Sequence, residues 1–375
     1  MKKITILGAG MIGSAITADL SKDYKVTVVD NNENRLRRLS SELSVTTLRQ
    51  DLQDKSQLKE AIKDADLVVG AVPSFMGYET LKSVIEAGKN VVDITFFNED
   101  PFELTELAKR NSVTAVVDCG VAPGLSNIIL GYYDEIMKIE SFKCYVGGLP
   151  FERKWPYEYK APFSPADVIE EYVRPARIME NGKIVIKEAL SEPELIETEA
   201  GTLEAFYTDG LRSLLKTMII PDMKEKTLRY PGHIELMKVF RETGLFNNEE
   251  IEVNGKMVKP VELTSRLLFP FWKPEKDEKE FTVLIIKIFG EGKNIEYSVF
   301  DEFNEATKTS SMARTTGYTC TAVANLILNG DYREKGISPP EFVGRNEKCF
   351  NEVLAYLEER SINIKRKHKK IFFDD

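Results

Sequence analysis

Three glycines near the start of the chain have the spacing of a loop that binds a dinucleotide pyrophosphate. Gly8, Gly10 and Gly13 follow an apolar run at residues 4–7 and precede a helix-compatible stretch at residues 14–22. In such a unit the first glycine permits a tight turn, the second lets the backbone approach the phosphates, and the third lets helix and strand pack closely. The predicted phosphate-binding residues are Gly8, Ala9, Gly10, Met11, Ile12 and Gly13.

An acidic residue at the end of the next apolar run indicates which dinucleotide binds. Residues 26–29 lead into Asp30, about 20 residues beyond the first glycine of the loop. A carboxylate there accepts hydrogen bonds from the ribose 2′-OH and repels the additional phosphate of NADP, so the predicted cofactor is NAD. Two alternatives stay open: Asp30 could serve only the turn at residues 30–32, and Arg35 and Arg37 could permit some use of NADP.

The elements that must position this loop alternate regularly. Strand-like runs at residues 45–48, 67–72, 91–94 and 113–117 are separated by helix-like segments at 55–63, 78–87 and 101–111. This alternation predicts an α/β fold, a Rossmann domain with a doubly wound parallel sheet and ligands at the carboxyl ends of its strands. The strand ends supply candidate cofactor contacts at Asp51, Leu52, Val72, Pro73 and Cys119, candidate catalytic groups at Asp93 and Asp118, and a substrate contact at Thr95.

The pattern changes after a Gly- and Pro-rich crossing at residues 120–127. Strand-like runs at 142–146, 183–187 and 203–206 precede a hairpin formed by 281–289 and 294–300, whereas residues 315–329 are again helical. We therefore expect a Rossmann domain made of residues 1–122 and 312–375. The expected second domain, residues 123–311, is of the α+β class and contains a mostly antiparallel sheet. The basic run at 365–370 is expected to be a solvated tail.

Two junctions in the second domain carry side chains suited to an amino-acid substrate. One contains Arg212, and the other contains Arg229, Tyr230 and His233. An arginine fork binds a planar carboxylate, so Arg212 and Arg229 are candidate substrate anchors beside Tyr230. The neutral form of His233 could take a proton, in competition with the two strand-end aspartates. The alternatives are structural ion pairs for the arginines and a capping or packing role for His233.

Composition excludes several other classes of protein. The net charge of −9 offers no broad basic surface for nucleic acid, and no apolar stretch is long enough for a membrane helix. The four cysteines form no Cys-x-x-Cys pair and only two histidines are present, so neither a disulfide framework nor a metal site is expected. We expect a cytoplasmic dinucleotide enzyme and, at this size, a homodimer.

The chain resembles the saccharopine dehydrogenase-like family, and within it the archaeal L-lysine 6-dehydrogenase branch. The resemblance covers nearly the whole chain and rests on the glycine loop together with DCGVAPGLSN at 118–127, YVGGLP at 145–150, DGLRS at 209–213 and TLRYPGH at 227–233. It implies NAD-dependent oxidative deamination of the lysine ε-amine to 2-aminoadipate 6-semialdehyde and ammonia. Saccharopine and carboxynorspermidine dehydrogenases of the same family are an alternative, and a non-catalytic NAD(H) sensor is another.

Overall fold

The computed structural model describes residues 1–370 and divides into two compact units. The first unit consists of Met1–Met137 and Ala313–Ile362, and the second consists of Lys138–Met312 and the segment from Asn363 onward. The boundary differs from the expected one at residue 122, because helix α6 (Leu125–Ile136) belongs to the first unit.

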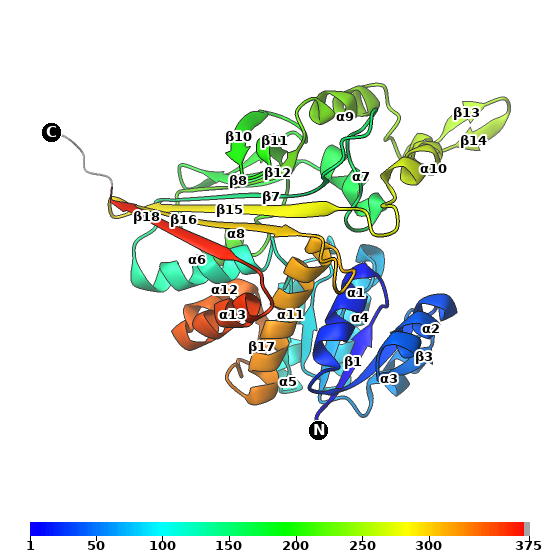
Figure 1. Ribbon diagram of the computed structural model, residues 1–375, viewed down its shortest axis with the longest axis vertical. Coiled ribbons are helices and arrows are strands. Elements are labelled where there is room, and N and C mark those ends of the chain that lie inside the picture. Colours follow the sequence, from blue (N-terminus) through cyan, green and yellow to red (C-terminus); the bar gives the residue numbers. More distant parts are fainter. Residues whose placement is uncertain (371–375) are drawn as a thin grey trace. The chain divides into compact units, whose positions relative to one another are not determined.

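The sheet of the first unit has seven parallel strands in the order β17-β6-β5-β4-β1-β2-β3. Their bounds are β1 Lys3–Leu7, β2 Lys25–Asp30, β3 Thr46–Arg49, β4 Leu67–Gly70, β5 Val91–Asp93, β6 Thr114–Val116 and β17 Gly336–Ser338. The order reverses between β1 and β4, which is where a Rossmann sheet binds its ligand. The predicted Rossmann fold is confirmed (Figure 1).

Helices accompany this sheet along the chain. Their bounds are α1 Met11–Leu20, α2 Glu33–Glu42, α3 Lys55–Ile62, α4 Ser74–Glu86, the short η1 Pro101–Leu104, α5 Thr105–Arg110, α6, α11 Ser311–Asn329, α12 Pro340–Arg345 and α13 Glu347–Glu359. The side chains of Asn32 and Asp54 accept hydrogen bonds from the first turns of α2 and α3, as good N-cap residues do.

A buried carboxylate explains why the C-terminal helices return to the first unit. Asp19 of α1 accepts hydrogen bonds from Thr321 of α11 at 2.7 Å, from Tyr356 of α13 at 2.7 Å and from Arg360 at 2.8 Å. A buried charge is retained where such partners compensate its desolvation. These contacts join α1, α11 and α13.

The second unit contains a nine-stranded mixed sheet. Its main path is β10-β11-β12-β7-β15-β16-β18, with β8 paired to β12 and β9 paired to β8. Within residues 1–370 only β12 and β7 of this sheet pair in parallel, so the expectation of a mostly antiparallel sheet is met. The strands are β7 Ser141–Pro150, β8 Ala176–Glu180, β9 Lys183–Lys187, β10 Glu194–Thr198, β11 Gly201–Tyr207, β12 Asp222–Arg229, β15 Glu280–Gly290, β16 Lys293–Glu302 and β18 Ile364–Lys370.

An aromatic core lies between this sheet and the helices α7 (Pro165–Val173), α9 (His233–Glu242) and α10 (Pro260–Trp272). Tyr172, Phe206, Trp272 and Phe281 are fully buried in it. The remaining elements are α8 (Leu214–Thr217) and a separate hairpin of β13 (Ile251–Val253) and β14 (Lys256–Val258).

The expectation of a solvated tail at residues 365–370 holds for the side chains of residues 365–367, which are exposed, but not for the backbone, which is a strand. This segment forms β18 and pairs antiparallel with β16 at the edge of the second sheet. Lys365 pairs with Glu199 at 2.7 Å and Lys367 with Glu296 at 3.3 Å, so nearby carboxylates offset the basic charge. No helix in the described residues is both long and apolar enough to span a membrane.

Candidate active site

The loop between β1 and α1 has the backbone that a pyrophosphate site requires. Gly8 has a φ of +110°, and a Cβ there would lie 2.3 Å from the Ala71 carbonyl oxygen. A Cβ on Gly13 would lie 2.1 Å from the Gly8 carbonyl oxygen, so the packing of the chain itself requires both glycines. A Cβ on Gly10 would meet no atom within 4 Å. Internal packing therefore does not require a glycine at position 10, and the space beside it would admit a closely approaching phosphate.

The first turn of α1 completes this anion site. Gly10 is the N-cap, and the turn that starts at Met11 and Ile12 contains no acidic side chain. Backbone N–H groups at a helix N-terminus attract a phosphate through hydrogen bonds and the helix dipole. Ala9 is different, because its N–H donates to the Asp30 carboxylate at 2.7 Å. The loop therefore fits a dinucleotide, and Ala9 serves by fixing its shape.

Asp30 lies at the end of β2 with both carboxylate oxygens engaged. Oδ2 accepts from the Ala9 N–H and Oδ1 from the Asn32 N–H, each at 2.7 Å, while Arg35 lies 3.9 Å away. The turn role left open by the sequence is thus real, but the same side chain also touches the glycine loop. Because each carboxylate oxygen has two acceptor sites, Asp30 can still accept from a ribose hydroxyl.

The predicted cofactor contacts after β3 and β4 lie at the carboxyl ends of these two strands. Leu52 and Val72 are buried in the apolar core of the first unit, and Pro73 is the N-cap of α4. Asp51 is exposed and accepts a hydrogen bond from the Gln53 N–H at 3.0 Å. Contact of these four residues with the cofactor remains a prediction.

Asp93, Asp118 and Cys119 come together at the carboxyl ends of β5 and β6. The Cys119 N–H donates to the Asp93 carbonyl oxygen at 2.9 Å, and the Asp93 carboxylate accepts from the Thr95 N–H at 2.7 Å. Burial, followed by the nearby Asp118 and Asp93 carboxylates, raises the pKa of the Cys119 thiol, so this cysteine is a poor nucleophile.

Two features of this cluster were not foreseen. Asp118 has a φ of +53°, a conformation that non-glycine residues seldom adopt and that recurs at functional sites. Cys320 of α11 lies close by: burial and then the neighbouring Cys119 and Asp93 raise the pKa of its thiol. No local pattern links residues 119 and 320, which are far apart in the sequence.

The TLRYPGH segment is placed in the aromatic core of the second unit. Arg229 is only 2% exposed and pairs with Glu171 at 2.6 Å, and its guanidinium lies 4.4 Å from the centre of the Tyr159 ring. This environment favours the structural ion pair over the substrate anchor, because Arg229 already has a carboxylate partner.

His233 and Tyr230 are also engaged internally. The His233 ring contacts the Tyr172 hydroxyl through Nε2 and the Tyr157 carbonyl oxygen through Nδ1, both at 2.9 Å. Burial and then the charge of Arg229 lower the pKa of His233 to about 3. The Tyr230 hydroxyl donates to the Pro150 carbonyl oxygen at 2.8 Å. The geometry therefore favours the packing role left open for His233 and weighs against a direct catalytic one.

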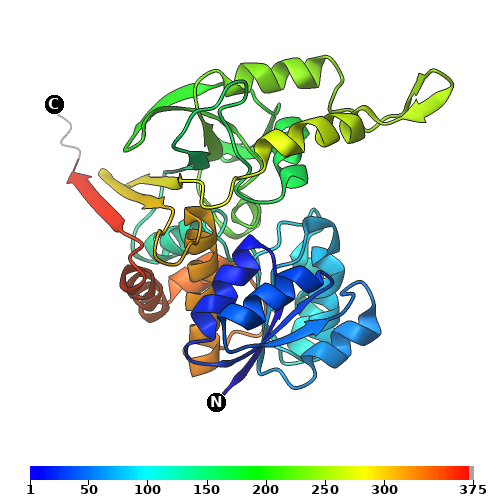
Figure 2. The same ribbon diagram turned by 45° about the vertical axis from the view of Figure 1, so that its right-hand side comes forward.

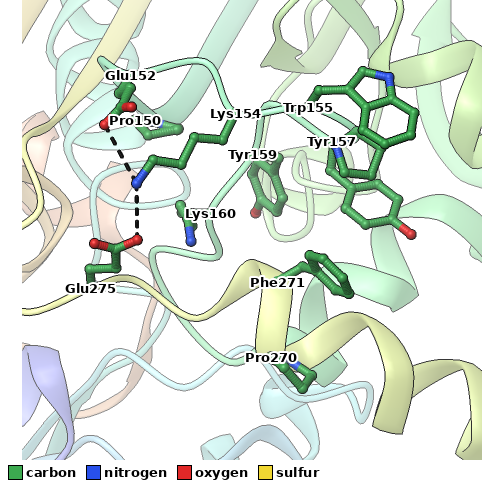
Figure 3. Close-up of a pocket in the computed structure, with 11 residues that line it drawn as sticks. Pro150, Glu152, Lys154, Trp155, Tyr157, Tyr159, Lys160, Pro270, Phe271 and Glu275 are labelled. Carbon is green, nitrogen blue, oxygen red and sulfur yellow. Dashed lines mark hydrogen bonds and ion pairs between the residues drawn. The ribbon is translucent and has the colours of Figure 1, made fainter.

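The second unit has a cavity of about 250 Å³ (Figure 3), and Arg229, Tyr230 and His233 each contact a residue of its wall. Its lining residues are Pro150, Glu152, Lys154, Trp155, Pro156, Tyr157, Tyr159, Lys160, Pro270, Phe271 and Glu275. Tyr230 holds Pro150, His233 holds Tyr157, and Arg229 packs on Tyr159. Inside the rim, Lys154 pairs with Glu275 at 2.9 Å and with Glu152 at 3.5 Å.

Arg212 stays a candidate anchor for the substrate carboxylate. It follows β11, is half-buried and has a φ of +43°, which gives the junction an unusual backbone. Its neighbour Asp209 is held by a forked ion pair with Arg177 at 2.9 and 2.8 Å. Residues 1–370 contain no cluster of three His, Cys, Asp or Glu side chains that could hold a metal ion, within the part searched.

The first unit thus has the class of a dinucleotide-binding Rossmann domain, and two family models match the chain. Residues 4–116 match the saccharopine dehydrogenase NADP binding domain, and residues 120–362 match the saccharopine dehydrogenase C-terminal domain. The chain belongs to the saccharopine dehydrogenase family. The predicted family is confirmed, and a nicotinamide dinucleotide is the cofactor that its loop and its family share.

Characterised relatives are distant. The chain is 25% identical over 276 residues to saccharopine dehydrogenase [NADP(+), L-glutamate-forming] of Saccharomyces cerevisiae, covering 68% of this chain and 61% of that protein. It is 24% identical over 267 residues to the mitochondrial alpha-aminoadipic semialdehyde synthase of Mus musculus, covering 66% of this chain and 29% of that protein. The match therefore covers less than a third of the length of that animal relative.

A solved structure agrees on the fold. The apo saccharopine dehydrogenase (L-Glu forming) from Saccharomyces cerevisiae superposes with a TM-score of 0.81 at 18% identity, covering 98% of this chain and 100% of that chain. The yeast relative is named for NADP, whereas Asp30 predicts NAD here.

Proposed function

We propose that the chain is an NAD-dependent dehydrogenase that oxidatively deaminates the ε-amine of L-lysine to 2-aminoadipate 6-semialdehyde and ammonia. The observation that carries the proposal is the Asp30 carboxylate, buried against the glycine loop by its bond to Ala9. A fixed negative charge there disfavours a 2′-phosphate. Membership of the saccharopine dehydrogenase family supports an amino-acid substrate. The sequence motifs resemble those of the lysine 6-dehydrogenase branch, which supports lysine.

Bound NAD would supply the hydride acceptor, and the residues of this chain would bind and deprotonate the amine. Only a neutral amine has the lone pair that assists loss of hydride, and the unperturbed pKa of a lysine ε-amine is about 10.4. Asp93 and Asp118, brought together beside Cys119, are the proposed groups that receive its proton. Arg212 is the proposed anchor of the substrate carboxylate.

A saccharopine dehydrogenase is the second candidate, favoured by the names of the relatives. Such an enzyme would release glutamate rather than ammonia. A protein that binds NAD(H) without turnover is a third possibility and would show no amine-dependent NADH formation.

The test compares initial rates of dinucleotide reduction with L-lysine and with saccharopine, each offered NAD and NADP. The proposal predicts that lysine with NAD is the fastest pair and that its rate rises with pH as the ε-amine deprotonates. If the chain reduces the dinucleotide with saccharopine but not with lysine, it is a saccharopine dehydrogenase. Binding of NAD without turnover of either substrate would reject the proposal that the chain is an enzyme.

A further inference from the structure

The cavity of the second unit lies between the segment that follows β7 and the end of α10. Its lining residues come from the ranges 150–160 and 270–275. Figure 2 shows α10, in yellow-green, running from the β13–β14 hairpin back to the body of the unit, where its end reaches the cavity. The volume of about 250 Å³ is below the roughly 300–1,000 Å³ of pockets for drug-sized ligands. The cavity therefore suits a molecule about as small as one amino acid.

This cavity has a polar end and an aromatic end. In Figure 3 the charged side chains of Lys154, Lys160 and Glu275 lie on one side of the view. The rings of Tyr157 and Phe271 lie on the other side. A ligand that satisfies both ends has a charged part and an apolar part.

Lys160 brings a mostly buried ammonium group to the polar end. Only 15% of its side chain is exposed, and Nζ donates to the Lys273 carbonyl oxygen at 3.2 Å. The Glu278 carboxylate lies 3.9 Å from Nζ, which offsets part of the charge but is too far for a hydrogen bond. An ammonium group has three donors, so among residues 1–370 Lys160 keeps two that are not used. A ligand carboxylate is the acceptor that would pair with them most strongly.

Glu152 and Glu275 share a single ammonium group at the same end. Lys154 Nζ lies 2.9 Å from a Glu275 oxygen and 3.5 Å from a Glu152 oxygen. Two negative charges thus surround one positive charge, and the two carboxylates keep acceptor sites for a second ammonium group. An α-amino acid carries a carboxylate and an ammonium group on adjacent atoms. Its zwitterion therefore matches the donors of Lys160 and the acceptors beside Lys154.

The aromatic end is held from behind and exposed in front. His233 Nδ1 lies 2.9 Å from the Tyr157 carbonyl oxygen, and the Tyr157 ring meets Phe271 edge to face with 5.8 Å between centroids. Phe271 and Trp155 are 57% and 88% exposed although both line the cavity. Exposed rings beside a cavity favour a ligand with a ring of its own, because aromatic pairs gain energy beyond the area that they bury.

We propose that this cavity is a binding site for one α-amino acid with an aromatic side chain. The ligand carboxylate pairs with Lys160, its ammonium group pairs with Glu152 and Glu275, and its ring packs on Phe271. This proposal is independent of the proposed reaction, since no residue named in that reaction lines the cavity.

The tryptophans of the chain provide a local readout for binding. There are two, Trp155 at the cavity and the fully buried Trp272. Titration of the full chain with L-phenylalanine should change the tryptophan fluorescence to a saturating value, and calorimetry should give the same Kd. Trp155→Phe should lose most of the fluorescence change but still release heat on binding.

Two shortened ligands test the polar end. Phenethylamine lacks the carboxylate, and 3-phenylpropanoate lacks the ammonium group. Each should bind at least about tenfold more weakly than L-phenylalanine, because each leaves one set of charged groups without its partner. Equal affinity of all three ligands would contradict the proposed pairing.

Three variants place the ligand in the cavity. Lys160→Met should weaken the binding of L-phenylalanine by at least about tenfold, because it removes the carboxylate partner. Phe271→Ala should also weaken it, and since Phe271 is exposed this change does not disturb the core. The matched control Lys183→Met removes an exposed ammonium group on β9 and should bind normally.

Arg212→Ala separates this cavity from the proposed anchor of the substrate carboxylate. Binding of L-phenylalanine should survive that change. If Arg212→Ala abolishes binding while Lys160→Met and Phe271→Ala leave it intact, the amino acid binds at the proposed substrate site and the cavity proposal is wrong. Absence of binding to the wild type at millimolar ligand would also overturn it, whereas a failure to oxidise lysine bears only on the proposed reaction.

Discussion

The burial of Arg229 decides between two roles for a single residue, an anchor for the substrate carboxylate and a structural ion pair. Its charge is compensated by Glu171 and covered by Tyr159, so removing it leaves a partly buried carboxylate without its partner. Arg229→Ala should therefore cost about 3–5 kcal/mol of unfolding free energy. Arg212→Ala should cost less unfolding free energy than Arg229→Ala, and it should raise the activation free energy for kcat/KM by about 2–4 kcal/mol with NAD affinity retained. Denaturant unfolding and steady-state kinetics on both variants distinguish the structural role from the substrate-anchoring role. A loss of kcat/KM in Arg229→Ala and a loss of stability in Arg212→Ala would show that the two roles are assigned the wrong way round.

His233 makes a pH-dependent contribution to stability with a defined sign. Its pKa is about 3 in the folded chain, against about 6.5 when unfolded. Between these values the unfolded chain binds one more proton, so this contribution is complete above pH 6.5 and is lost as the pH falls toward 3. The unfolding free energy of the wild type should therefore fall about 1.4 kcal/mol more steeply per pH unit than that of His233→Gln below pH 6. Parallel curves would show that His233 titrates normally.

Asp30 links one side chain to the choice of dinucleotide. Asp30→Ala removes both the acceptor for a 2′-OH and the repulsion of a 2′-phosphate. The ratio of kcat/KM for NAD over NADP should fall at least tenfold, or about 1.4 kcal/mol. Because the carboxylate also holds the Ala9 N–H, some affinity for NAD should be lost as well. Asp64→Ala, which changes an exposed carboxylate in the turn between α3 and β4, is the matched control. An unchanged ratio in Asp30→Ala would show that Asp30 serves only the turn.

At the scale of elements, the β1–α1 loop assigns different tasks to its glycines. Gly13→Ala should destabilise the chain by at least about 2 kcal/mol, since its Cβ would collide with the Gly8 carbonyl. Gly10→Ala should fold with stability within about 1 kcal/mol of the wild type, yet raise the Kd for NAD at least tenfold. Thermal unfolding and cofactor titration test the pair. If the Gly10→Ala variant binds NAD normally, the cofactor phosphate does not bind at this glycine.

The elements also show where sequence alone was sufficient. The glycine loop, Asp30 and the alternation of the first sheet lie within short windows, so local patterns predicted them. Arg229 and His233 find partners in Glu171 and Tyr172 of α7, about 60 residues earlier, and no local signal connects them. The sequence did not predict the strand β18, because its basic residues lack the apolar alternation of a half-buried strand. Hydrogen bonding to β16 stabilises this strand instead.

At the scale of the molecule, the discontinuous first unit follows from a contact that no short window contains. Asp19 joins α1 to α11 and α13 across more than 300 residues of chain. The helical pattern of residues 315–329 indicated a return to the first domain, but the Asp19 contacts identify which residues hold it there. The boundary at Met137 likewise depends on packing of α6 with α12 rather than on the Gly- and Pro-rich crossing.

The central claim, oxidation of lysine with loss of its ε-nitrogen, is tested most directly by following that atom. L-Lysine labelled with ¹⁵N at the ε position is incubated with the chain and NAD, and labelled ammonium is measured against the NADH formed. The reaction consumes one NAD and one water per protonated ε-amine and yields one aldehyde, one ammonium, one NADH and one proton. We therefore predict one labelled ammonium for each NADH. NADH without labelled ammonium, or ammonium carrying the α-nitrogen instead, would contradict the account.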